Sequence, residues 1–206
     1  GTAMSIPFQD SETAKNLLRA FAGESQARNR YDFAANLCQK QELQAMAFIF
    51  QATAKQEQAH AKVFWDHLQA LNGQNLPIYG AYPIEGTNRI LELLRAAQHN
   101  EHEEHGSVYP SFAAIATQEG FPEAAASFRQ IAAIEQLHGE RFGLLADQLE
   151  SGALFVSQIE TGWMCLNCGH TQNSLEAPKQ CPVCNHGQGW FIRLELAPWS
   201  PVVKQT

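Results

Sequence analysis

The sequence has no long hydrophobic run and comparatively few basic residues. No stretch of the 206-residue chain approaches the roughly 20 apolar residues that cross a membrane. The polar N-terminus also lacks the charged and apolar regions of a signal peptide. Lys and Arg number 14 against 21 Asp and Glu, which gives a formal net charge of −7. We therefore expect no membrane and no nucleic-acid partner, because nucleic-acid binding needs a basic patch.

Cysteine is scarce outside one short region. Four of the five cysteines form two C-x-x-C pairs, Cys165/Cys168 and Cys181/Cys184, whereas Cys38 stands alone in a helical stretch. In an intracellular protein such pairs are typical of metal ligands rather than disulfides. This usage predicts a reducing, cytoplasmic compartment. We expect the Cys38 thiol to be buried in the core.

Length and composition predict one helical domain followed by a small module. A chain of 206 residues with 45% apolar content can form one substantial core and a second short unit. We place the helical domain at residues 5–152 and the module at residues 160–200. Residues 1–3, ahead of Met4, have the character of a cloning remnant and are left out of both domains.

Apolar residues recur at steps of three and four along four stretches, which is the period of amphipathic helices. The expected helices run from about residue 10 to 40, 43 to 71, 87 to 118 and 122 to 151. Residues 74–86 contain two prolines and two glycines and cannot form regular helix. They are long enough for a crossover between the second and third helices. The pattern predicts a mainly α fold, a ferritin-like four-helix bundle with one long crossover.

Acidic residues interrupt the apolar seam of each predicted helix. All of these acids are in phase with the apolar residues, not opposite them. A buried carboxylate without a partner costs several kcal/mol, and a whole domain is stable by only about 5–15 kcal/mol. Cations must therefore offset the charge. The acidic and imidazole residues on or beside the seams are Glu24, Glu57, His60, Glu101, Glu104, Glu135 and His138.

Mixed Glu and His ligands favour iron or manganese over calcium, and their placement predicts a two-metal carboxylate site. The ligand set is asymmetric, since Ala27 stands at i+3 from Glu24 while Glu104 is a surplus acid. We therefore expect the two metals to differ in coordination. Tyr31 and Tyr109 lie near the ligands in sequence, and each is either a core tyrosine or a hydrogen-bond donor to a ligand carboxylate.

The C-terminal cysteine pairs form two knuckles whose spacing suits one tetrahedral metal ion, in a zinc-ribbon or Fe(Cys)₄ module. Gly169 and Gly187 are expected to allow turns around the thiolates. Trp163 and Trp190 can cover a module that is too small for a large core of its own. On the motif alone, structural zinc is favoured over iron.

The sequence resembles the rubrerythrin family over essentially its whole length after Met4. The resemblance rests on the segment AFAGESQARNRY at residues 20–31, on the cysteine knuckles, and on Glu57-x-x-His60, Glu101-x-x-Glu104, Tyr109-Pro110 and Glu135-x-x-His138. It implies a ferritin-like bundle followed by a rubredoxin-like β module. It also implies a di-iron peroxidase that reduces hydrogen peroxide to water in oxidative-stress defence. Electrons would come from the Fe(Cys)₄ centre.

The resemblance implies a role for each matched residue. Four cysteines, Cys165, Cys168, Cys181 and Cys184, would hold the single iron, which zinc can replace in a given preparation. His60 would exchange with Glu104 as a ligand of one iron, and we take these two residues with Tyr31 and Tyr109 as the candidate catalytic residues. The other di-iron ligands would be Glu24, Glu57, Glu101, Glu135 and His138.

The resemblance further implies a homodimer or larger homo-oligomer in which the module of one subunit serves the di-iron site of another. An external reductase would supply the electrons. Two other readings compete with this one. A ferroxidase or iron-storage protein would leave the cysteine tail without a purpose, and a zinc-ribbon interaction module would leave five seam glutamates unexplained. About three irons per chain would support the peroxidase reading.

Overall fold

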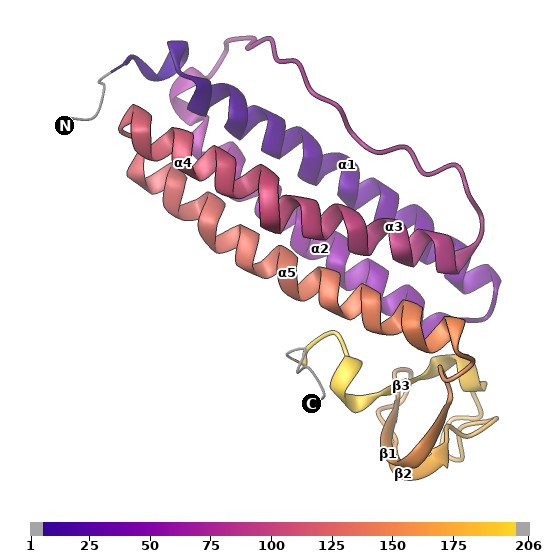
Figure 1. Ribbon diagram of the computed structural model, residues 1–206. Coiled ribbons are helices and arrows are strands. Elements are labelled where there is room, and N and C mark those ends of the chain that lie inside the picture. Colours follow the sequence, from indigo (N-terminus) through magenta and orange to yellow (C-terminus); the bar gives the residue numbers. More distant parts are fainter. Residues whose placement is uncertain (1–5, 201–206) are drawn as a thin grey trace.

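In a computed structural model that describes residues 6–200, long helices form a bundle with a small β-sheet module at one end (Figure 1). The predicted bundle of four helical stretches is confirmed, with the third stretch interrupted. The segment 1–3, predicted to be a cloning remnant, lies outside the described residues. The long helices are α1 (Glu12–Lys40), α2 (Gln44–His67), α3 (Ile90–Glu103), α4 (Tyr109–Glu119) and α5 (Pro122–Glu150).

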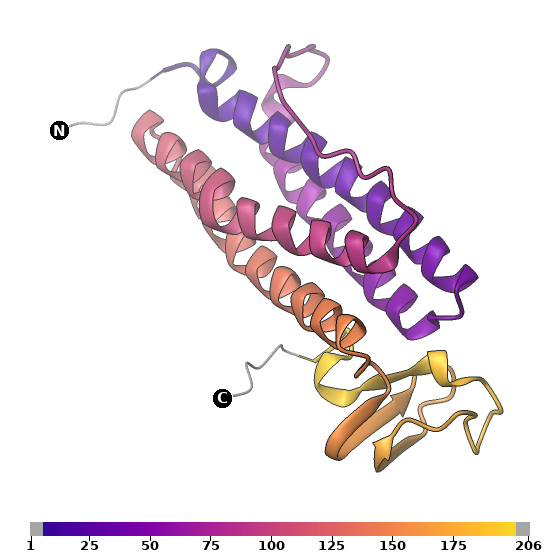
Figure 2. The same ribbon diagram turned by 45° about the vertical axis from the view of Figure 1, so that its right-hand side comes forward.

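The predicted crossover joins the short 3₁₀ turn after α2 to α3 and runs back beside α1 (Figures 1 and 2). It extends beyond the predicted end at residue 86, because α3 begins at Ile90 and not at Thr87. The Thr87 hydroxyl oxygen accepts the backbone N–H of Arg89 at 3.1 Å. That local contact competes with helical hydrogen bonding and delays the helix start.

Polar contacts tie the crossover to α1. The Tyr82 hydroxyl donates to the backbone carbonyl of Arg19 at 3.0 Å. Further along, the Arg30 guanidinium pairs with the half-buried Glu85 carboxylate at 2.9 Å. These two contacts hold the crossover against α1.

A π-helical segment, Glu104–Val108, separates α3 from α4. A π turn holds more residues than an α turn, so the apolar face shifts along the sequence after it. In unbroken α-helical register the apolar seam predicted for residues 87–118 would continue through Val108, Ser111 and Ile115, and the π-helical segment breaks that register. The residues buried in this stretch are Tyr109, Ala113 and Ala116.

Two apolar clusters fill the bundle and leave the acids between them. One cluster includes Tyr31, Phe50 and Phe142, together with Cys38, which is fully buried as predicted. The other lies toward the opposite end and includes Phe128. Apolar side chains thus seal the acidic layer at both ends.

The C-terminal module is a three-stranded antiparallel sheet of order β2-β1-β3. Its strands are β1 (Val156–Cys165), β2 (Thr171–Glu176) and β3 (Phe191–Arg193), so the sheet begins before the predicted domain start at residue 160. Trp163 is fully buried in its core. The Trp190 ring meets Phe48 of α2 at a centroid distance of 5.8 Å, which places the module against the end of the bundle.

No described helix is long and apolar enough to cross a membrane.

Candidate metal centres

Two groups of four buried side chains meet inside the bundle and share two carboxylates. Within each group, one ligand atom from every residue lies within 4.8 Å of the others. The first group is Glu24, Glu57, His60 and Glu135, and the second is Glu57, Glu101, Glu135 and His138. Because Glu57 and Glu135 belong to both groups, the arrangement suits two adjacent metal ions bridged by two carboxylates.

Helical spacing explains why these side chains converge. The pairs Glu57/His60 on α2 and Glu135/His138 on α5 are three residues apart, so both members of each pair project from the same helix face. α1 adds Glu24 and α3 adds Glu101. Six of the seven bundle residues predicted as ligands are therefore brought together.

Several ligand atoms face this space without a hydrogen-bond partner. The Nδ1 atom of His60 lies 2.7 Å from Oε1 of Glu135, yet neither atom has a hydrogen bond of acceptable geometry among the described residues. Two lone pairs directed at the same cation would produce such an approach. The unpartnered atoms of the six residues are Glu24 Oε2, Glu57 Oε2, His60 Nδ1, Glu101 Oε2 and both carboxylate oxygens of Glu135. This Glu/His cluster fits a di-iron site.

Without bound cations, the carboxyl groups cannot all remain ionised. Burial, with the nearby Glu135 and Glu24 carboxylates, raises the pKa of Glu57 well above 4.5. Burial also favours neutral Glu135, but His138 and His60 outweigh it and hold the pKa of Glu135 at about 2. Four carboxylates match the charge of two divalent cations, so metal binding is expected to release protons from this cluster.

Two tyrosines hold ligand carboxylates from outside the cluster. The Tyr31 hydroxyl donates to Glu101 Oε1 at 2.7 Å, and the Tyr109 hydroxyl donates to Glu24 Oε1 at 2.5 Å. Both tyrosines are buried. The sequence left open whether each residue is only a core tyrosine or a hydrogen-bond donor to a ligand carboxylate, and the structure supports the second role for both.

Nothing in the sequence pattern predicts the contact that Gln56 makes with His138. The Gln56 side-chain Oε1 lies 2.6 Å from Nε2 of His138, so that Nδ1 of the same ring faces Glu57 Oε1 at 3.0 Å. A ligand imidazole is commonly oriented by such a partner on its second nitrogen. Gln56 is exposed and flanks Glu57, and no periodicity or spacing in the sequence distinguishes it from a surface residue.

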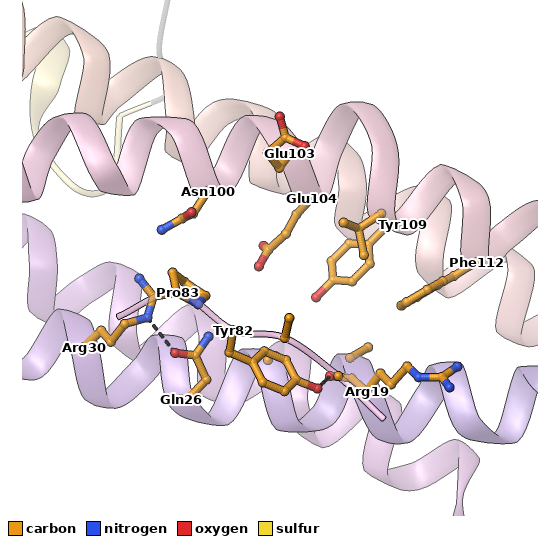
Figure 3. A pocket seen from close by; sticks show the side chains of 15 residues that line it. Arg19, Gln26, Arg30, Tyr82, Pro83, Asn100, Glu103, Glu104, Tyr109 and Phe112 are labelled. Carbon is orange, nitrogen blue, oxygen red and sulfur yellow. Dashed lines mark hydrogen bonds between the residues drawn. The ribbon is translucent and has the colours of Figure 1, made fainter. Parts of the chain in front are cut away.

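Glu104 lies outside both four-residue groups. It lines a pocket of about 310 Å³ between α1, the crossover and the π-helical segment (Figure 3). Burial, with the Glu24 carboxylate, raises the pKa of Glu104 well above 4.5. The two groups thus have matching compositions of three Glu and one His. The expected asymmetry of the ligand set therefore comes from Glu104 alone, and the absence of a ligand at Ala27 does not contribute to it.

Gly139 allows α5 and α3 to approach closely beside the cluster. A Cβ atom at this position would lie 2.6 Å from His102 Cδ2 and 3.3 Å from Glu101 Cβ. The absent side chain therefore helps to set the position of a ligand carboxylate, a role that the sequence analysis did not anticipate.

The variant Gly139→Ala is expected to displace His102, and Glu101 with it, because the added methyl group occupies their space. We expect one metal to bind about tenfold more weakly, in line with other changes that reorient metal ligands. Metal titration of the apoprotein measures this. Gly143→Ala is the matched control, since its Cβ would meet only the side-chain amide of Gln98. Equal metal affinities in the two variants would contradict the role assigned to Gly139.

The four thiol sulfurs of the module lie within 4.8 Å of one another. The Sγ atoms of Cys165 and Cys184 are 3.7 Å apart, as are those of Cys168 and Cys181. A tetrahedral site with metal–sulfur bonds of about 2.3 Å has an edge of about 3.8 Å, whereas a disulfide measures about 2.05 Å. The cluster therefore fits one metal ion without rearrangement.

The two knuckles turn at equivalent positions. Gly169 follows the first knuckle with φ +85°, and Asn185 follows the second with φ +65°. The expectation that Gly187 makes the second turn is wrong, because its φ is −70°. Beyond that turn, the backbone N–H of His186 stabilises the Cys184 thiolate and lowers its pKa to about 6.

Comparison with known proteins agrees with both metal centres. Residues 15–146 match the family described as Rubrerythrin, and residues 163–192 match the family described as Rubrerythrin, rubredoxin-like domain. The chain belongs to the rubrerythrin family. The rubredoxin-like match favours iron in the four-cysteine site over the zinc that knuckle spacing alone favours. Membership of the rubrerythrin family indicates an oxidoreductase.

Curated relatives match almost end to end. The rubrerythrin of Porphyromonas gingivalis is 44% identical over 190 residues, which is 92% of this chain and 94% of the relative. The rubrerythrin of Nitratidesulfovibrio vulgaris is 40% identical, covering 92% of this chain and 97% of the relative.

Solved structures agree in fold. Partially reduced nigerythrin has a TM-score of 0.60 at 23% identity, with 94% of each chain covered. Mycobacterium tuberculosis bacterioferritin, BfrA, also has a TM-score of 0.60, at 18% identity, covering 69% of this chain and 88% of the other.

Proposed function

We propose that this chain is a peroxidase that reduces hydrogen peroxide to water in oxidative-stress defence. The observation that carries the proposal is a pair of four-ligand groups sharing Glu57 and Glu135, in one chain with a four-cysteine iron site. A reduced iron pair bound there would supply two electrons from adjacent metals, as cleavage of an O–O bond requires. Each turnover converts hydrogen peroxide, two electrons and two protons into two waters.

The proposal assigns each cluster residue a role. Tyr31 and Tyr109 hold the Glu101 and Glu24 carboxylates in place through their hydroxyl groups. The proposed ligands of the two irons are Glu24, Glu57, His60, Glu101, Glu135 and His138, and those of the third iron are Cys165, Cys168, Cys181 and Cys184.

Glu104 is the proposed proton carrier and, on oxidation, the alternative ligand to His60. Burial, with the Glu24 carboxylate, raises the pKa of Glu104 and so favours its protonated form. Additional positive charge in the cluster would lower the pKa of Glu104 and favour release of its proton. Because Glu104 lines the pocket, that proton lies on the side from which substrate would enter.

Electron delivery favours a partner subunit. The module contacts the start of α2, and Glu57 lies thirteen residues beyond Gln44 along that helix. At 1.5 Å per residue this is about 20 Å, and electron transfer slows steeply with distance. We infer a homodimer or larger homo-oligomer, in which the module of another subunit approaches the cluster and receives electrons from an external reductase.

Anaerobic reoxidation tests the proposed function. The iron-loaded protein is reduced, then mixed with hydrogen peroxide or with oxygen while iron oxidation and peroxide consumption are followed. We expect faster oxidation by peroxide and about three irons per chain. Faster oxidation by oxygen, with ferric iron retained in excess of the sites, would favour a ferroxidase instead. Zinc in the cysteine site of the native protein would break the proposed electron path.

The variant Glu104→Ala is expected to keep its fold and iron content and to lose about 100-fold in peroxide turnover, as removal of a general acid commonly does. Stopped-flow turnover on protein of measured iron content checks this. Glu103→Ala is the matched control, because the Glu103 carboxylate points away from that of Glu104 (Figure 3). Unchanged turnover in fully loaded Glu104→Ala would rule out the role.

A further inference from the structure

The pocket beside Glu104 is larger than hydrogen peroxide needs. Its volume is about 310 Å³, whereas a water molecule occupies about 30 Å³ in the liquid. Sites for small organic ligands begin at about 300 Å³. We call it the strap pocket, because residues 80–83 of the crossover form its outer wall (Figure 3).

Small side chains create the space in the strap pocket. Ala20 and Gly23 line it from α1, and Gly80 and Ala81 line it from the crossover. The Tyr82 ring lies across Gly23, where a Cβ atom would be 3.4 Å from the ring. The hydrogen bond from Tyr82 to the α1 backbone holds that ring in place.

The strap pocket combines apolar walls with polar side chains, which include Gln26, Arg30, Asn100 and Glu104. Val108 and Phe112 add apolar surface from the π-helical segment and α4. The Glu104 carboxyl group points from the π-helical segment toward α1 (Figure 3), and among residues 6–200 it has no hydrogen-bond or ion-pair partner. The combination suits a small amphipathic molecule with its polar end at Glu104 and its apolar body against Tyr82 and Phe112.

We propose that the strap pocket binds the organic group of alkyl hydroperoxides, and that the protein reduces these in addition to hydrogen peroxide. The inference rests on the proposed peroxidase function, which supplies the two electrons through the same metal centres. The O–O bond of ROOH breaks, two protons are taken up, and the products are the alcohol ROH and water. The organic group stays in the strap pocket while the hydroperoxide group lies at Glu104.

Turnover of two substrates tests the proposal. Hydrogen peroxide and cumene hydroperoxide are compared as oxidants of the reduced, iron-loaded protein. Ala81→Phe adds a ring to the pocket wall and is expected to lower kcat/KM for cumene hydroperoxide at least about tenfold, as a steric change of this size does in apolar pockets. The value for hydrogen peroxide should fall less than that for cumene hydroperoxide, because hydrogen peroxide does not need the space that the added ring fills. Ile84→Phe, on the same crossover, is the control, because Ile84 is 96% exposed and does not line the pocket.

A binding measurement separates this proposal from the proposed function. The alcohol product 2-phenyl-2-propanol is titrated into the zinc-loaded full-length protein, and ring resonances of Tyr82 and Phe112 are followed by NMR. We expect saturable shifts at both rings that Ala81→Phe abolishes. Absence of these shifts, or equal effects of Ala81→Phe and Ile84→Phe on both substrates, would overturn the pocket assignment. Saturable binding without any peroxide turnover would instead overturn the peroxidase function and leave the pocket as a ligand site.

Discussion

Glu57→Gln is expected to stabilise the metal-free protein and to abolish metal binding. Glu57 is fully buried, and burial together with Glu135 and Glu24 disfavours its ionised form. The neutral amide has nearly the same shape and avoids that cost. Because Glu57 belongs to both ligand groups, its loss should weaken both metals by more than about 100-fold. The melting temperature of the metal-free variant should exceed wild type by roughly 2–4 °C per kcal/mol recovered, while added Fe(II) should no longer raise it.

The expected effect of Glu57→Gln depends on pH with a definite sign. A carboxyl group whose folded pKa is raised imposes no cost below its unfolded pKa and destabilises the fold progressively as pH rises above it. The Glu57 pKa is raised well above 4.5, so the metal-free variants should diverge above about pH 4.5 and converge below it. Thermal melts of metal-free protein from pH 4 to 8 measure this divergence.

Two other variants calibrate the Glu57 result. Glu24→Gln removes a ligand from the first group only and should leave one metal bound. Glu123→Gln changes an exposed acid on α5 and should affect neither metal content nor melting temperature. If the metal-free Glu57→Gln protein were less stable than wild type at pH 7, burial of the Glu57 carboxylate would not be what destabilises the metal-free protein.

Cys181→Ser is expected to stop multiple turnover while leaving a single turnover intact. Cys181 is fully buried in the module core with Trp163 and Phe191, and the free energy of metal binding in such a small unit is also folding free energy. Turnover driven by an external reductase should therefore fall more than about 100-fold. Oxidation of a chemically reduced bundle by one equivalent of peroxide should stay within about twofold of wild type, because the two sites are separate.

Cys38→Ala is the matched control for Cys181→Ser. Cys38 is the one cysteine outside the knuckles, and burial raises its pKa to about 12, which makes it a poor nucleophile and ligand. This variant should retain all iron and both activities, apart from a small loss of packing. If Cys181→Ser kept full reductase-driven turnover, electrons would have to enter the bundle without the module.

Periodicity was sufficient for the bundle and for most of the candidate site. A carboxylate in phase with apolar residues must be buried, and buried carboxylates need cations, so Glu24, Glu57, Glu101 and Glu135 could be read from register alone. The same reasoning failed after Glu104, where the π-helical segment moved the buried face to Tyr109 and Ala113. A π-helical insertion depends on tertiary packing, and no periodic pattern of residues in the sequence marks it.

The sequence pattern also did not predict the close contacts between residues of different helices. From the sequence, Gly139 is only an unfavourable residue inside a helix, whereas the structure shows that His102 occupies the space beside it. From the sequence, Gln56 is a surface residue, whereas in the structure its side chain contacts His138. Both contacts join residues from different helices, and a one-dimensional pattern contains no information about which helices touch.

The amino-acid sequence by itself determined the helical bundle, its acidic layer and the four-cysteine knuckles, because helical phase and ligand spacing are local properties of the chain. The tertiary structure alone decided which carboxylates are shared between the two ligand groups. It also placed Glu104 beside a pocket and outside those groups, and made Asn185 the second knuckle turn. Those features depend on distances between separate elements, which only packing sets.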